Sequence, residues 1–194
     1  MELFSGQYSS QGHGVRYARW VRSPAGIQRG IVDSTRIIQM DIYPTLLELA
    51  GAPLRPDDHI DGVSLAPIMQ SRGVIAKRPL YFHFPHYTHA QGPTSSIIDA
   101  DNWKLIQYYN TYSGEFQLFN LNTDPFEIED LVGLHPNKVQ ELKAKLDAYL
   151  VEVDAELPYP NPIYEGNPTK GKDFSYNRAL SDRKSKEKRI LEAN

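Results

Sequence analysis

The sequence predicts a mixed fold of helices and strands, α/β or α+β, with an α+β unit in its second half, on two observations. Between Leu80 and Leu121, four short stretches rich in β-branched and aromatic residues alternate with turn-forming pairs such as Asp101-Asn102 and Ser113-Gly114. Because short turns connect antiparallel neighbours, these stretches predict a four-stranded antiparallel sheet. An amphipathic segment from Pro136 to Val153 then predicts a helix that covers one face of that sheet.

The elements of this second portion are defined by their apolar patterns. The predicted strands are Leu80 to Phe84, Ser95 to Asp99, Trp103 to Tyr109 and Phe116 to Leu121. The predicted helix carries one apolar stripe, Val139, Leu142, Leu146, Tyr149 and Val153. Trp103 and Phe119 lie inside apolar strand patterns, which favours packing over a stacking platform for a ligand.

The first portion is punctuated by prolines and glycines. Val15 to Arg22 mostly alternates apolar and basic residues, as a half-buried strand does. Asp41 is predicted to cap a helix that has Pro44 in its first turn and Gly51 at its end. We expect the apolar face of this helix to pack in a core; its members are Ile42, Leu46, Leu49 and Ala50.

Composition divides the chain into three parts. Pro, Asp, Gly and Arg gather between Ala52 and Lys77 and indicate a surface crossing between two structural units. Beyond Leu157 the chain is rich in Pro and Gly, and Lys170 to Asn194 is polar and basic. The predicted parts are residues 1–75, 76–157 and 158–194, the last of them an extended wrap with a polar basic tail.

Charge and residue usage exclude several classes of function. The net charge of -3 on 194 residues is too small to indicate a nucleic-acid partner. No stretch approaches the roughly 18 consecutive apolar residues of a membrane span, so no span is predicted. The chain has no cysteine, which excludes disulfides, thiolate metal sites and a cysteine nucleophile. No secretory signal is predicted to begin at Met1.

Three histidines, His83, His86 and His89, are spaced at intervals of three, a pattern that invites a metal site. On a strand His83 and His86 would face opposite sides unless Pro85 turns the chain, and no Cys, Asp or Glu lies nearby in sequence to complete a ligand set. We therefore predict no metal there. A substrate contact is favoured, and a structural role stays open.

For two groups of acidic residues, a structural role is favoured over a calcium site or an acid–base pair. Asp57, Asp58 and Asp61 lack the alternating pattern and closing Glu of a calcium loop, so a solvated crossover loop is favoured. Asp99 and Glu115 belong to separate strand regions, and nothing pairs them as an acid and a base. No catalytic residue is predicted in this chain.

Several short motifs occur in a fixed order. They are Asp41 to Gly51, Asp61 to Leu65, Arg78 to Tyr87, Gly92 to Ile97, Trp103 to Ile106, Leu118 to Glu127 and His135 to Lys138. In this order they resemble the C-terminal portion of a type I sulfatase, an arylsulfatase-like enzyme of the alkaline-phosphatase-like superfamily. The resemblance covers the chain from Gly6 to Tyr164, and we identify no resemblance for the tail from Gly166.

The resemblance implies a division of labour. Residues 1–75 would be the end of the large catalytic α/β domain, and residues 76–157 the small C-terminal domain. The family attacks sulfate esters with a formylglycine made from a C/S-x-P/A-x-R motif and uses calcium; neither that motif nor the calcium ligands has a counterpart here. We expect the chain to supply the wall of the substrate cleft in an enzyme that hydrolyses sulfate monoesters of sulfated glycans, and to be inactive alone.

The resemblance also nominates substrate-binding residues. In such enzymes the loop after the first strand of the small domain leans over the cleft, which makes His83, His86 and Tyr87 candidates. Arg16 matches an arginine of a glycine-rich family segment, whereas Gln7 stands where the family has a sulfate-binding lysine. The intact enzyme is expected to be periplasmic or secreted.

A second hypothesis keeps the fold and changes the role. The chain would be a separately encoded, non-catalytic module that binds a catalytic half or an anionic glycan. Strand edges left uncovered in the first portion and the basic residues of the tail support it. A phosphonate or phosphate ester hydrolase of the same superfamily is a further alternative.

Overall fold

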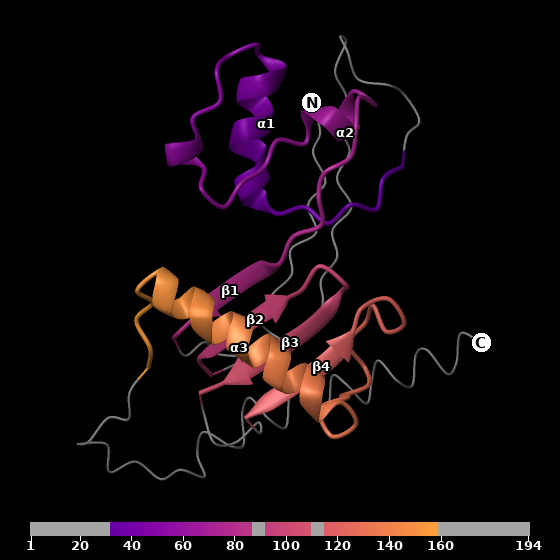
Figure 1. Ribbon diagram of the computed structural model, residues 1–194, viewed down its shortest axis with the longest axis vertical. Coiled ribbons are helices and arrows are strands. Elements are labelled where there is room, and N and C mark those ends of the chain that lie inside the picture. The colour runs from indigo at the N-terminus through magenta and orange to yellow at the C-terminus, as the bar shows by residue number, and fades with distance from the viewer. Residues whose placement is uncertain (1–31, 87–91, 110–114, 159–194) are drawn as a thin grey trace. The chain divides into compact units, whose positions relative to one another are not determined.

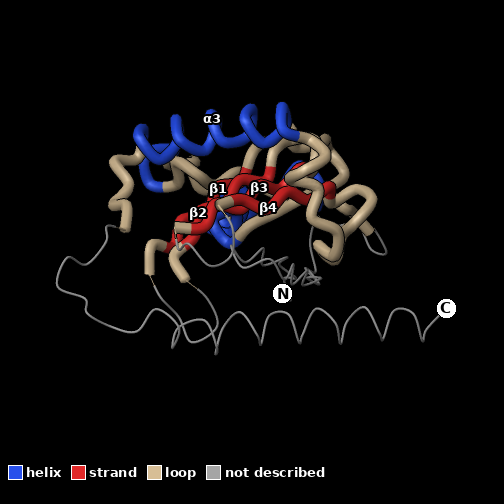
Figure 2. Tube along the Cα trace, turned by 90° about the horizontal axis from the view of Figure 1, so that it is seen from below, coloured by secondary structure: helices blue, strands red, loops and turns tan. Residues whose placement is uncertain are grey.

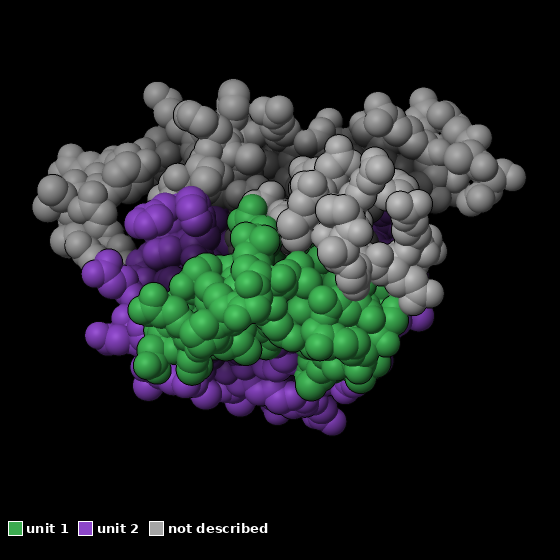
Figure 3. Space-filling view, turned by 90° about the horizontal axis from the view of Figure 1, so that it is seen from above, with its two compact units in different colours: residues 1–8, 15–77 green, residues 9–14, 78–194 purple. Residues whose placement is uncertain are grey.

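The computed structural model describes residues 32–86, 92–109 and 115–158. They fall into two compact units that divide between Lys77 and Arg78 (Figures 1 and 3). Each unit is considered by itself below. The three predicted parts, residues 1–75, 76–157 and 158–194, stay a prediction.

The second unit is built on an antiparallel sheet (Figure 1). Its strands are β1 (Leu80–Phe84), β2 (Thr94–Ile98), β3 (Trp103–Tyr108) and β4 (Phe116–Asn120), paired in the order β1-β2-β3-β4. Each neighbour in sequence is also the neighbour in space, because short turns cannot carry the chain farther. The predicted four-stranded antiparallel sheet is confirmed.

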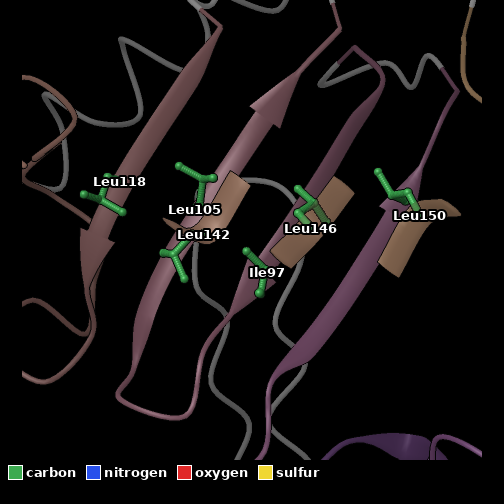
Figure 4. Packing of buried hydrophobic residues seen from close by; sticks show 6 residues of the cluster. All are labelled: Ile97, Leu105, Leu118, Leu142, Leu146 and Leu150. Carbon is green, nitrogen blue, oxygen red and sulfur yellow. The ribbon is translucent and has the colours of Figure 1, made fainter. Parts of the chain in front are cut away.

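Helix α3 (Pro136–Glu152) lies across one face of this sheet (Figure 2). The residues that pack between them are Ile97, Leu105, Leu118, Leu142, Leu146 and Leu150 (Figure 4). The predicted stripe is wrong at its end. Val153 lies beyond the helix and is 47% exposed, whereas Leu150 continues the spacing of four residues from Leu146 and is buried. No helix in the described part of the chain is long and apolar enough to cross a membrane.

The opposite face of the sheet is buried as well. Leu80, Ile98, Lys104, Ile106 and Phe119 point away from the α3 side by strand alternation, and each is at most 3% exposed. The two central strands are therefore buried on both faces. A polar side chain on β2 or β3 must find its hydrogen-bond partners inside the fold.

In the first unit, hydrogen bonds made by the side chains of Asp41 and Thr45 form a polar clasp at the start of a short helix. Its elements are η1 (Gln39–Asp41), α1 (Ile42–Leu49), η2 (Pro56–Asp58) and α2 (Ala66–Met69). The buried carboxylate of Asp41 accepts hydrogen bonds from the backbone N–H groups of Ile38 and Val63, both at 2.9 Å. We predicted that Asp41 caps α1. It stands at the N-cap position, but its side chain makes no capping hydrogen bond and instead joins two distant segments. Gly51, at φ +70°, ends the helix as expected.

The buried face of α1 also differs from the prediction. Leu46 is 45% exposed and Ala50 is exposed, whereas Pro44 and Thr45 are buried. The reason is the clasp, since the hydroxyl of Thr45 accepts the N–H of Leu65 at 2.8 Å and turns that side of the helix inward. Gly62 completes it, because a Cβ there would stand 2.3 Å from the carbonyl oxygen of Met40.

The α3 packing generates a stability prediction. Leu146→Ala removes a fully buried side chain and should lower the free energy of unfolding by about 2–5 kcal/mol. Val151→Ala changes a residue of the same helix that is 81% exposed and should cost less than about 0.5 kcal/mol. Urea denaturation followed by circular dichroism measures both. Equal losses in the two variants would contradict the observed packing.

Candidate substrate-contact region

Polar side chains gather at the end of the sheet where β1 ends and β2 begins. His83 of β1 lies opposite Ser95 of β2, and its Nδ1 is 2.7 Å from the Ser95 hydroxyl. Its Nε2 is 2.9 Å from the backbone carbonyl oxygen of Glu156, which follows α3. The Ser95 hydroxyl is in turn 2.8 Å from the hydroxyl of Tyr109, the residue after β3. Four segments of the unit therefore meet at one histidine.

The electrostatics of this group indicate a structural network rather than a nucleophile. Burial raises the pKa of the Tyr109 hydroxyl, and the hydrogen bond to Ser95 opposes the rise only in part. Ser95 is fully buried, so its hydroxyl is out of reach of a substrate even though an imidazole stands beside it. Both nitrogens of His83 are engaged within the fold. The geometry favours the structural alternative for His83.

His86 is placed differently from His83. It is exposed, beyond the end of β1, and its ring meets the edge of Phe84 at a centroid distance of 5.6 Å. Phe84 is itself 41% exposed. An exposed imidazole beside an exposed aromatic ring can contact a sugar ring and an anionic group together. Two other nominated residues, Arg16 and Tyr87, and the third histidine, His89, lie outside the described residues. Substrate contact stays a prediction for all of them.

A buried ion pair was missed by the sequence reasoning. Lys104 of β3 and Glu127 are both fully buried, and the Lys104 ammonium lies 2.9 and 2.8 Å from the two carboxylate oxygens. Burial lowers the pKa of Lys104, and the attraction of Glu127 opposes that effect only in part. Glu127 holds a φ of +57°, a conformation rare for a residue with a side chain. A lysine in the middle of an apolar strand was the available signal.

Carboxylates that follow the strands bind backbone groups. Asp99 accepts the N–H groups of Asp101 and Trp103 at 2.9 Å and forms an ion pair with Lys138 of α3 at 2.8 Å. Burial would lower the pKa of Lys138, but hydrogen bonds to Asp99 and Glu141 raise it overall. Asp99 thus fixes the turn between β2 and β3 and attaches the start of α3, which is a structural role.

The acidic loop of the first unit holds Asp57, Asp58 and Asp61. Asp58 forms an ion pair with Arg55 at 2.7 Å, and Nδ1 of His59 faces the carbonyl oxygen of Gly62 at 3.2 Å. Within the ranges that the structure describes, no three His, Asp or Glu side chains come together as metal ligands. The loop is organised by its own hydrogen bonds.

Comparison with known proteins defines the class. The family described as N-sulphoglucosamine sulphohydrolase, C-terminal, matches residues 12–156. The chain belongs to this family, and with it to the C-terminal portions of type I sulfatases, as the sequence motifs predicted.

This chain aligns with only part of the length of each of its relatives. A sulfatase of Formosa agariphila is 28% identical over 170 residues, which are 76% of this chain and 31% of that protein. Arylsulfatase K of Xenopus laevis is 33% identical over 119 residues, 58% of this chain and 22% of that protein. The structure of BT4656 in complex with its substrate D-glucosamine-2-N,6-O-disulfate aligns with a TM-score of 0.57 at 26% identity, covering 72% of this chain and 29% of that one. The chain thus spans less than a third of each.

The buried pair generates a prediction with a defined pH dependence. Glu127→Gln leaves the Lys104 ammonium without its counter-charge and should cost about 3–5 kcal/mol of unfolding free energy at neutral pH. Without Glu127 the pKa of Lys104 falls further below 10.5, so the unfolded chain binds more protons than the folded one between that lowered pKa and 10.5. The loss should therefore shrink as pH rises through this window.

The control uses a pair on the surface. Glu141→Gln removes a carboxylate that Lys138 and Lys145 share on the exposed side of α3, and it should cost at most about 1 kcal/mol. Denaturation of both variants at several pH values measures the difference. A Glu127→Gln variant as stable as Glu141→Gln would show that the pair is not buried.

Proposed function

We propose that this chain is the C-terminal part of a sulfatase that hydrolyses sulfate monoesters of sulfated glycans, in which it forms a wall of the substrate cleft. The observation that carries the proposal is the family match over residues 12–156, which takes in both described units. The matched family is described by a sulfated glucosamine substrate, and a related structure holds a disulfated glucosamine. Sulfated glucosamine is accordingly the substrate class proposed.

Within this function the loop end of the sheet is the proposed contact surface. His86 and Phe84 are exposed there, and His83, two residues before Pro85, anchors the strand from which they extend. An imidazolium at His86 would attract a sulfate or carboxylate, and Phe84 would pack against the apolar face of a pyranose ring. Such contacts select among substrates and do not perform the reaction.

The residues present do not fit the calcium site or the formylglycine of the family. The chain has no cysteine, none of its serines stands in the required motif, and Asp58 is already paired with Arg55. We propose that both groups belong to a portion of the sulfatase outside this sequence. A periplasmic or secreted location of the whole enzyme is part of the proposal.

Binding tests the contact surface directly. The chain should bind a sulfated glucosamine oligosaccharide more tightly than its desulfated counterpart, and His86→Ala should weaken binding about three- to tenfold, the loss of one hydrogen bond. Lys145→Ala, which removes an exposed cation from α3, is the matched control and should change affinity little. Equal affinity for the sulfated and desulfated sugars in calorimetric titration would overturn the proposal.

Activity gives an independent prediction. The 194-residue chain, purified and supplied with calcium, should not hydrolyse an aryl sulfate or a sulfated glucosamine, because it lacks the nucleophile. Release of sulfate measured by ion chromatography checks this. Calcium-dependent turnover that persists through successive purification steps would contradict the assignment of the chemistry to another portion.

A further inference from the structure

The hydrogen bonds around His83 can run in only one direction while the ring is neutral. The carbonyl oxygen of Glu156 is an acceptor, so Nε2, at 2.9 Å, must carry the proton. Nδ1 is then an unprotonated acceptor, and the Ser95 hydroxyl at 2.7 Å must donate to it. The Ser95 oxygen is left to accept from the Tyr109 hydroxyl at 2.8 Å. The order is Tyr109 to Ser95 to His83 to Glu156.

We propose that His83 is a positioning residue that works through this chain of hydrogen bonds. In its neutral form it holds the end of β1 and the segment after α3 to the same end of the sheet, and a second proton on its ring reverses the half of the chain that runs through Ser95. Because His86 follows from β1, the proposal extends the proposed function and rests on it for the role of His86.

The reversal has a definite structural cost. When Nδ1 carries a proton it donates to Ser95, and we expect the Ser95 hydroxyl to turn its own proton toward Tyr109, its other partner in the structure. Ser95 is fully buried, so water cannot take over its bonds. Burial raises the pKa of Tyr109, so its hydroxyl keeps its proton at neutral pH.

Two charged side chains of α3, Lys143 and Asp147, act on Tyr109 electrostatically, and they form an ion pair with each other. Beyond the helix, Glu156 takes part in the series of hydrogen bonds through its backbone carbonyl.

The tautomer is the first measurement. In the full chain labelled with ¹⁵N at histidine, long-range ¹H–¹⁵N correlation at neutral pH should show His83 protonated at Nε2 and unprotonated at Nδ1. The His83→Gln variant identifies its signals among those of the six histidines. A proton on Nδ1, or a mixture of both tautomers as in a free imidazole, would overturn the proposal. The tautomer itself is measured in the unsubstituted chain, and His83→Gln serves only to assign the signals.

Tyr109→Phe tests the reversal. It leaves the neutral arrangement of Ser95, His83 and Glu156 intact but removes the acceptor that Ser95 needs when His83 is charged. His83 should then take up its second proton at a pH about half to one unit lower than in the parent, equivalent to one lost hydrogen bond. Tyr108→Phe removes the neighbouring hydroxyl, which donates to Gln117, and should leave the midpoint unchanged. The same midpoint in Tyr109→Phe and the parent would exclude the reversal.

Ser95→Ala tests the positioning. It cuts the chain of hydrogen bonds, and amide hydrogen exchange should speed up about tenfold at residues that flank His83 and Glu156, while amides of α3 at Leu142 and Leu146 keep their protection. Unchanged exchange at both flanks would refute the role. Failure of glycan binding with the expected tautomer would contradict the proposed function alone; the opposite tautomer with intact glycan binding would contradict the role of His83 alone.

Discussion

Burial of both faces of the four-stranded sheet is the constraint on which the rest of the second unit depends. With α3 on one side and a second set of buried residues on the other, β2 and β3 have no exposed face for a polar side chain. Burying an unpaired polar group or charge costs several kcal/mol, and the fold matches one lysine of β3 and one serine of β2. Lys104 has Glu127, and Ser95 has His83 and Tyr109.

The same constraint explains why family motifs that suggest chemistry are structural here. Lys104, in the motif Trp103 to Ile106, forms the buried ion pair with Glu127, the last residue of the motif Leu118 to Glu127. In the first unit, Asp41 and Thr45 of the motif Asp41 to Gly51 form the clasp. Gly62, in the motif Asp61 to Leu65, permits the close approach of the two segments. These contacts hold each of the two units in its fold.

The candidate contact region follows from where the sheet stops. Within the sheet, Ser95 and Lys104 are bound by other side chains. At its end, where the chain leaves β1, His83 and His86 have different surroundings. His83 faces the α3 side and is engaged at both ring nitrogens, whereas His86 is exposed beside Phe84. Two of the three equally spaced histidines therefore differ in the described residues, since one is bound within the fold and the other is exposed.

The sequence by itself determined the four strands, α3 and most of its buried stripe, because these depend on local periodicity and on turns that join neighbours. The order of its short motifs indicated the sulfatase class. Tertiary structure decided the rest. The Lys104–Glu127 pair joins residues 23 positions apart, and His83 meets Glu156 across 73 positions. Which side of α1 is exposed, and why Leu150 and not Val153 is buried at the end of α3, likewise depend on which surfaces meet. Contacts between distant segments leave no periodic trace in the sequence, so only the folded chain reveals them.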